Sequence, residues 1–189
     1  MTAAGEDPLR VEGVDPALAA AVLEIEQHAA AEGWDQPARL FALVDTAELV
    51  AREPALARSM GLDDSSAAGS FTPIEQDSVG TDQVLEQVLE TIVWPAQVAG
   101  CAVVVERLVL PPEAEAQLPE DADAAQAMAR EHPLRQEVRI VAGATRAGAA
   151  YCALRLKAHD EDTSVVAGAD MVPRLTDLLR STLEEETDQ

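Results

Sequence analysis

Apolar residues first recur at helical spacing between Pro16 and Gly33. Asp15 provides an N-cap and Pro16 suits the first helical position, so the sequence predicts a helix that begins there and ends at Gly33. The apolar positions of this helix fall on one face and are Leu18, Val22, Ile25 and Ala29. We therefore expect an amphipathic helix that packs against the core.

Two later stretches have the same helical period. One begins at a cap at Thr81 or Asp82 and ends at Trp94-Pro95, and the other begins near Pro173. Their apolar faces contain Val84, Leu85, Val88, Leu89 and Ile92 in the first, and Leu175, Leu178, Leu179 and Leu183 in the second. Two shorter helices are expected over residues 46–52 and 124–130.

Continuous apolar runs indicate strands that are covered on both faces. The first is 39–45, and the clearest is 98–110, which Pro111-Pro112 terminates. Residues 135–144 and 149–158 predict an antiparallel hairpin. Strands separated by helices, together with one hairpin, favour an α+β fold with a mixed, largely antiparallel sheet of four or five strands flanked by helices.

The predicted elements form a single domain over residues 15–185. Residues 1–14 have no hydrophobic period and are expected to be a disordered N-terminal tail, and residues 186–189 are expected to be a frayed C-terminal tail. Residues 59–80 are rich in Ser, Gly, Asp and Ala, which predicts a flexible insertion or, alternatively, a functional flap.

The hairpin has an unusual pairing of charges. Both strands place apolar residues at even positions, and a three-residue loop, 146–148, gives a register in which the two apolar sets share one face. That register places Arg139 opposite Arg155, and Glu137 opposite Lys157, on the other face. Because like charges directly opposite each other are destabilising, another group must offset the two arginines.

Two interpretations of the arginines remain open. In one, Arg139 and Arg155 converge on the carboxylate or phosphate of a small ligand, with Glu106 as an acid or base and Arg107 as a further contact. In the other, the arginines balance the charge of acidic residues nearby in space. Glu106-Arg107 interrupts an apolar strand, and because neighbours point to opposite faces, each face of the sheet receives one of these charges.

Other residue types do not form a recognisable metal or catalytic pattern. The histidines and cysteines, none of them spaced as a ligand pair, are His28, His132, His159, Cys101 and Cys152. The acidic turn 160–162 lacks the alternating ligands of a calcium loop and is expected to be solvated. Trp34 and Trp94 either cap the ends of the core or form part of an exposed apolar patch. We predict no catalytic residue, no metal and no cofactor.

The charge of the whole chain limits the classes of partner. The 189 residues include 13 Lys and Arg against 35 Asp and Glu, which gives a net charge of −22. Nucleic acid and anionic membrane surfaces would both be repelled, so neither is an expected partner. No apolar stretch approaches the roughly 18–20 residues that span a bilayer, and we expect a cytoplasmic protein.

Five segments taken together carry a family resemblance. They are 33–44 (GWDQPARLFALV), 72–76 (TPIEQ), Trp94-Pro95, 98–102 (VAGCA) and 106–112 (ERLVLPP). The chain resembles a family of conserved uncharacterised proteins of actinobacteria from about residue 15 to residue 183, most specifically around Glu106. The family has no assigned activity, so the resemblance implies a cytoplasmic actinobacterial protein and transfers no catalytic residue.

The sequence favours a non-enzymatic protein-interaction or regulatory module that binds a protein partner or a second copy of itself. The support is that no nucleophile, base and orienting group are found as a set. The alternative is a module that binds or transforms a small anionic metabolite through the arginine cluster on the sheet. A third interpretation is that the acidic segments mimic nucleic acid or engage a basic protein.

Overall fold

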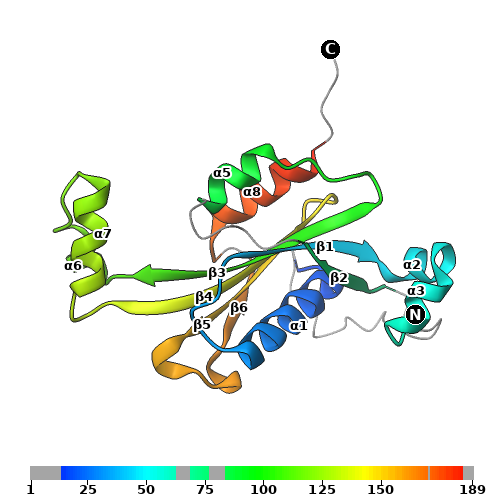
Figure 1. The fold of residues 1–189 in the computed structure, drawn as a ribbon, viewed down its shortest axis with the longest axis horizontal. Helices are drawn as coiled ribbons and strands as arrows, with labels where there is room; N and C mark the ends of the chain where they lie inside the picture. Colours follow the sequence, from blue (N-terminus) through cyan, green and yellow to red (C-terminus); the bar gives the residue numbers. More distant parts are fainter. Residues whose placement is uncertain (1–13, 63–68, 77–83, 170, 185–189) are drawn as a thin grey trace, which may run out of the picture.

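The computed structural model describes residues 14–62, 69–76, 84–169 and 171–184, whose elements form three layers (Figure 1). The middle layer is a six-stranded sheet in the order β2-β1-β3-β4-β5-β6. Its strands are β1 (Arg39–Asp45), β2 (Phe71–Glu75), β3 (Val98–Val109), β4 (Gln136–Thr145), β5 (Ala150–Leu156) and β6 (Val166–Gly168). All neighbouring strands in the sheet are antiparallel.

Helices cover both faces of this sheet (Figure 1). The α-helices are α1 (Pro16–Glu32), α2 (Thr46–Arg52), α3 (Pro54–Ser59), α5 (Leu85–Thr91), α6 (Pro112–Glu115), α7 (Ala122–Glu131) and α8 (Pro173–Leu183). Short 3-10 helices η1 (Lys157–His159) and η2 (Asp162–Ser164) follow β5. None of the helices in the described ranges is long and apolar enough to cross a membrane.

The predicted α+β class is confirmed, but the expected mixed sheet of four or five strands is wrong. In the described part of the chain all strand pairs are antiparallel, and the sheet has six strands because β2 and β6 add one strand at each edge. Both are difficult to recognise in the sequence. The β2 strand contains Pro73, which has no backbone N–H to donate and is tolerated at the edge of a sheet, where one side of the strand needs no partner. The β6 strand has only three residues.

Strand β2 also lies within the segment expected to be a flexible insertion, 59–80. The rest of that insertion at 63–68 and 77–80 lies outside the described residues, as do the predicted cap at Thr81 or Asp82 and the predicted tails, apart from Val14. Helix α5 begins at Leu85 after an N-cap at Val84. The domain boundaries therefore stay predictions.

The two faces of the sheet have separate cores. On one face, α1 buries Leu18 and Val22 against Leu43 of β1 and Val141 of β4. On the other face, α5 and α8 bury an apolar cluster that includes Leu89, Leu179, Val103 and Ala142. Where these helices cover β3, β4 and β5, both sets of alternating positions are shielded, so Arg139 and Arg155 do not lie on an open face.

Gly143 allows α1 to approach the sheet closely. A Cβ atom at this position of β4 would lie 2.9 Å from Val22 Cγ2 and 3.0 Å from Leu18 Cδ1. Real Cβ atoms essentially never come as close as the first of these distances. The lack of a side chain at Gly143 therefore fixes the depth at which α1 packs.

The predicted register of the hairpin is confirmed. Arg139 lies opposite Arg155 and Gly143 opposite Tyr151, and Gly148 in the loop has a φ of 92°, which glycine adopts without strain. The Lys157 Nζ atom lies 2.8 Å from Glu137 Oε2, as the complementary charges predict.

One end of the sheet continues as a two-stranded ribbon. Strand β1 pairs with β3 only as far as Val104, and β5 pairs with β4 only as far as Val138. Beyond these residues β3 and β4 pair with each other alone, up to Val109 opposite Gln136, and carry α6 and α7 away from the other helices (Figure 1). Residues 108–135, at the end of this ribbon, are termed the arm.

Candidate functional site

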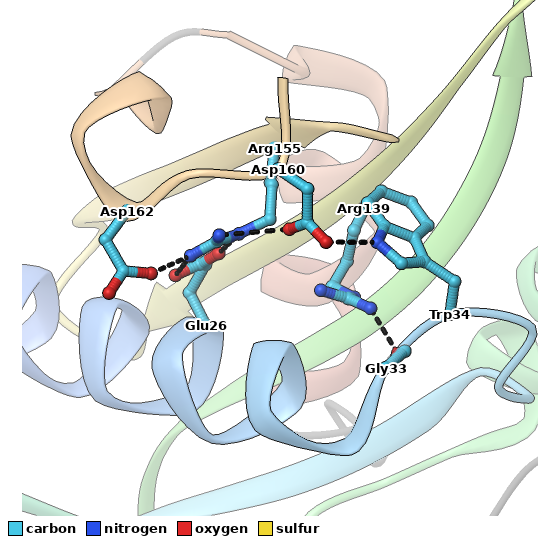
Figure 2. A network of polar contacts seen from close by, with 7 residues as sticks. All are labelled: Glu26, Gly33, Trp34, Arg139, Arg155, Asp160 and Asp162. Atoms are coloured by element: carbon cyan, nitrogen blue, oxygen red, sulfur yellow. Dashed lines mark hydrogen bonds and ion pairs between the residues drawn. The ribbon is translucent and has the colours of Figure 1, made fainter. Parts of the chain in front are cut away.

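Arg155 lies between β5, which carries it, and α1, and it is 2% exposed and surrounded by carboxylates (Figure 2). Its Nε and Nη2 atoms donate to Glu26 of α1, which is equally buried, with an Nη2–Oε2 distance of 3.1 Å. Nη1 donates to Asp160 Oδ1 at 3.1 Å, and Nη2 also donates to Asp162 Oδ1 at 2.6 Å. The hydrogen bonds to Glu26 are the main reason why the pKa of Arg155 is raised, so the guanidinium stays charged.

Arg139 is buried to the same degree, 1% exposed, but has a different environment. Its guanidinium carbon lies 4.4 Å from the centroid of the Trp34 ring, and Nη2 donates to the Gly33 carbonyl (Figure 2). Nη1 has no hydrogen-bond partner among the described residues, and no carboxylate there forms an ion pair with Arg139. Its charge is therefore stabilised chiefly by an aromatic face and a carbonyl oxygen.

Glu106 positions the turn that carries Trp34. Its two carboxylate oxygens accept hydrogen bonds from the backbone N–H groups of Asp35 at 2.8 Å and Gln36 at 2.7 Å. Asp35 has a φ of 63°, a left-handed conformation that is uncommon for a residue other than glycine. Trp34 Nε1 donates in turn to Asp160 Oδ2 at 3.0 Å, and this hydrogen bond is the main reason why the pKa of Asp160 is lowered.

The structure thus brings together three of the four residues predicted as a ligand site. Arg139, Arg155 and Glu106 all point to the α1 side of the sheet. Arg107 lies on the opposite side, where Nη2 forms an ion pair with Glu86 of α5. The predicted split of Glu106 and Arg107 between the two faces is confirmed, and for the same reason Arg107 cannot join the other three.

The geometry around Arg139 and Arg155 favours charge balance over ligand binding. Three carboxylates already occupy Arg155. The space between Arg139, Arg39 and Glu106 is too small to hold a water molecule. The hydrogen bonds and ion pairs of Arg139, Arg155 and Glu106 hold α1 and the turns at Trp34 and Asp160 against the sheet.

A family model described as PPA1309-like protein matches residues 18–184 of the chain. The chain belongs to the PPA1309-like family. This is an uncharacterised protein family, which agrees with the coarser part of the resemblance found in the sequence. No curated protein and no solved structure matches the chain. The PPA1309-like match includes every residue of the buried cluster but transfers no activity to it.

Several polar partners of the buried arginines in this member of the PPA1309-like family were not predicted from the sequence. Glu26 lies four residues after Val22, on the apolar face of α1, and a charge within an apolar stripe is a signal for a buried partner. The turn at 160–162 is exposed, as the sequence predicts, but the Asp160 and Asp162 carboxylates also reach Arg155. Nothing local in the sequence indicates that contact.

A second missed ion cluster lies at the edge of the sheet. Arg39 of β1 is 6% exposed, and its Nε and Nη2 atoms donate to the two carboxylate oxygens of Glu75 at 2.7 and 3.0 Å. Nη1 donates to Glu32 at the end of α1. The hydrogen bonds from Arg39 are the main reason why the pKa of Glu75 is lowered. This cluster ties edge strand β2 to α1.

The cysteines and tryptophans occupy structural positions. Cys101 and Cys152 are both fully buried, and burial raises the pKa of the Cys101 thiol to about 11, so it is protonated at neutral pH. Trp94 Nε1 donates to Thr182 Oγ1 at 3.0 Å, near the end of α8. Trp34 and Trp94 are both partly buried. In the described ranges, no group of three or more His, Cys, Asp or Glu side chains is arranged to hold a metal ion.

Proposed function

We propose that this PPA1309-like protein is a non-enzymatic interaction module of the actinobacterial cytoplasm, and that its arm binds a basic, partly apolar surface of another protein. The observation that carries the proposal is α7, a ten-residue helix of which no side chain is buried. Isolated helices of fewer than about 12–15 residues are marginal in water, and most helices are stabilised by packing. A partner that packs on α7 would supply the missing stabilisation.

The chemistry of the arm indicates the kind of partner. Three of its apolar side chains, Val109, Met128 and Leu134, are 44%, 42% and 60% exposed. Its exposed acids are Glu113, Glu115, Glu120, Asp121, Asp123 and Glu131. A complementary surface would present positive charge around an apolar anchor, since charge complementarity speeds encounter and burial of apolar groups stabilises the complex.

Site-specific crosslinking in cells of the source organism tests this proposal. A photoreactive amino acid replaces Met128 in the arm, and in the control it replaces Leu56 of α3, which is 46% exposed. We expect adducts with a basic protein at position 128 and not at position 56. Replacement of Glu113 and Asp123 by lysine, within the arm, should then weaken the binding of that purified protein by at least about tenfold.

Two outcomes would contradict the proposal. Adducts with the same proteins at both positions would mean that the arm has no specific role. Adducts only with a second copy of this chain would mean that the arm is a self-association surface, which analytical ultracentrifugation of the purified protein would check independently.

A further inference from the structure

A cavity of about 550 Å³ lies on the side of the sheet that faces away from Arg139, at the N-terminal ends of α5 and α8. This volume is within the usual range of small-molecule sites, roughly 300–1,000 Å³. Four elements line it: β3 and β4 form the floor, and α5 and α8 form the sides. The side chains that define its chemistry are Glu86, Arg107, Ile140, Arg174, Leu175 and Leu178.

The inner wall of this cavity is apolar and fixed. Ile140 of β4 and Leu175 of α8 are each 9% exposed and belong to the main core on this side of the sheet. Leu178, one turn further along α8, is partly buried and packs against the same core. An apolar group that enters would be covered by side chains that the rest of the fold already holds in place.

The charges at the cavity favour one negative group. Of the described residues that line it, two are arginines, Arg107 and Arg174, and one is a glutamate, Glu86, so the lining has a net positive charge. Glu86 forms an ion pair with Arg107, whereas the side chain of Arg174 forms no hydrogen bond or ion pair with any described residue. In a chain with a net charge of −22, a cavity with an excess of positive charge is a local reversal of the general field.

We infer that this cavity binds a small monocarboxylate with an apolar body, such as a medium-chain fatty acid. The carboxylate pairs with Arg174, and the chain lies along Ile140, Leu175 and Leu178. Glu86 competes for Arg107, so among the described residues that line the site Arg174 is the available cation, which disfavours ligands that carry several negative charges. This assignment moves the predicted anion site from Arg139 and Arg155 to the face on which Arg107 lies, and it does not depend on the function of the arm.

Octanoate and 1-octanol, which differ in charge but share a similar apolar chain, provide the probes. Titration of the isotope-labelled protein, followed by amide NMR shifts, should show saturable 1:1 binding of octanoate near Leu175. Arg174→Gln should weaken this binding about tenfold, as expected for the loss of a charge-assisted contact. The matched control is Arg180→Gln on the same helix, where Arg180 pairs with Asp177 and does not line the cavity, and it should leave binding unchanged.

Glu86→Gln is the sharpest variant, because a purely structural role predicts the opposite result. It releases Arg107 for the ligand and should tighten octanoate binding severalfold, while circular dichroism checks that the fold is intact. Equal affinity for octanol and octanoate, equal effects of the Arg174 and Arg180 variants, weaker binding by the Glu86 variant, or no saturable shift would each overturn the inference. None of these results bears on the crosslinking test of the arm.

Discussion

Arg155 illustrates, at the scale of single residues, how a buried charge is accommodated. The guanidinium and the Glu26 carboxylate are each about 2% exposed, so neither is solvated by bulk water. Removing one partner from such a pair leaves the other charge buried and uncompensated, whereas replacing both by apolar groups is often tolerated. Removing Glu26 alone should therefore destabilise the protein more than replacing Glu26 and Arg155 together by apolar residues.

Glu26→Ala should destabilise the protein by about 3 kcal/mol, the low end for a broken buried pair, because Asp160 and Asp162 still contact Arg155. Urea unfolding monitored by circular dichroism measures the change. Glu24→Ala, at an exposed position of the same helix, should change stability by no more than about 0.5 kcal/mol. The double variant Glu26→Leu with Arg155→Leu should recover most of the stability lost in Glu26→Ala. Equal losses of stability in all three variants would contradict the expectation that an unpaired buried charge is the cause.

Asp160 makes stability depend on pH. The hydrogen bond from Trp34 Nε1, with that from Arg155, holds its pKa in the folded protein below the ordinary value of 3.8. The unfolded chain therefore binds more protons between the two values, so the stabilisation is present above pH 3.8 and is lost as pH falls through the lower, folded pKa.

Asp160→Asn should accordingly be less stable than the natural protein at about pH 7, and the difference should shrink at about pH 3. Urea midpoints measured across this range test the expectation. Glu161→Gln, at the exposed neighbouring position, serves as the control and should show little difference at either pH. A deficit in Asp160→Asn that stays constant from neutral to acid pH would contradict the proposed linkage.

At the scale of elements, close packing between α1 and β4 depends on Gly143. Gly143→Ala should cost about 1–2 kcal/mol, because the new methyl group meets Val22 and Leu18 at 2.9 and 3.0 Å. Gly168→Ala in β6 should be nearly neutral, since its new Cβ would meet only Met171 at ordinary contact distances of 3.5 Å or more. Thermal and urea unfolding compare the two.

A compensating change makes this prediction more specific. Val22→Ala in the Gly143→Ala background removes the closest clashing methyl group and should cost less than the sum of the two single changes. Strict additivity would show that the contact between the two positions does not limit the packing of α1.

Features that depend on neighbouring residues could be predicted from the sequence, and features that depend on contacts between distant segments could not. The hairpin register could be derived because alternation and a three-residue loop ending at Gly148 are local signals. The packing of α1 over Arg139 and Arg155 could not be derived, because it depends on which helix packs on which face of the sheet. The contact between Arg155 and Asp160 depends equally on the path of a turn that nothing in its own residues specifies. The sequence therefore placed Arg139 opposite Arg155 and split Glu106 from Arg107 between the two faces, but it left open whether acids of the chain or a ligand neutralise the two arginines.

At the scale of the whole molecule, repulsion among the acids opposes folding. The net charge of the chain is −22, and most carboxylates of the described residues have no cation in contact. Salt screens exposed charges over a distance of about 10 Å at 0.1 M, and buried pairs are screened much less. The fold should therefore gain from added salt without losing the Glu26–Arg155 contact.

Raising sodium chloride from about 0.05 M to about 0.5 M should increase the midpoint of thermal unfolding by a few degrees. Differential scanning calorimetry measures this shift. The same increase should occur in the Glu24→Ala variant but should be smaller when several acids of the arm are replaced by glutamine. A fall of the midpoint with salt would mean that exposed ion pairs outweigh repulsion.

The contact between Glu26 and Arg155 also has a consequence for how the protein is made. The two residues are 129 positions apart, so α1 leaves the ribosome long before the strand that carries its partner has been synthesised. Until then, an apolar stripe and an unmatched carboxylate are displayed together on a nascent helix. Packing of α1 on the sheet must therefore wait until β5 and the turn at 160–162 have been synthesised, and we expect chaperones that act during translation to assist the early segments.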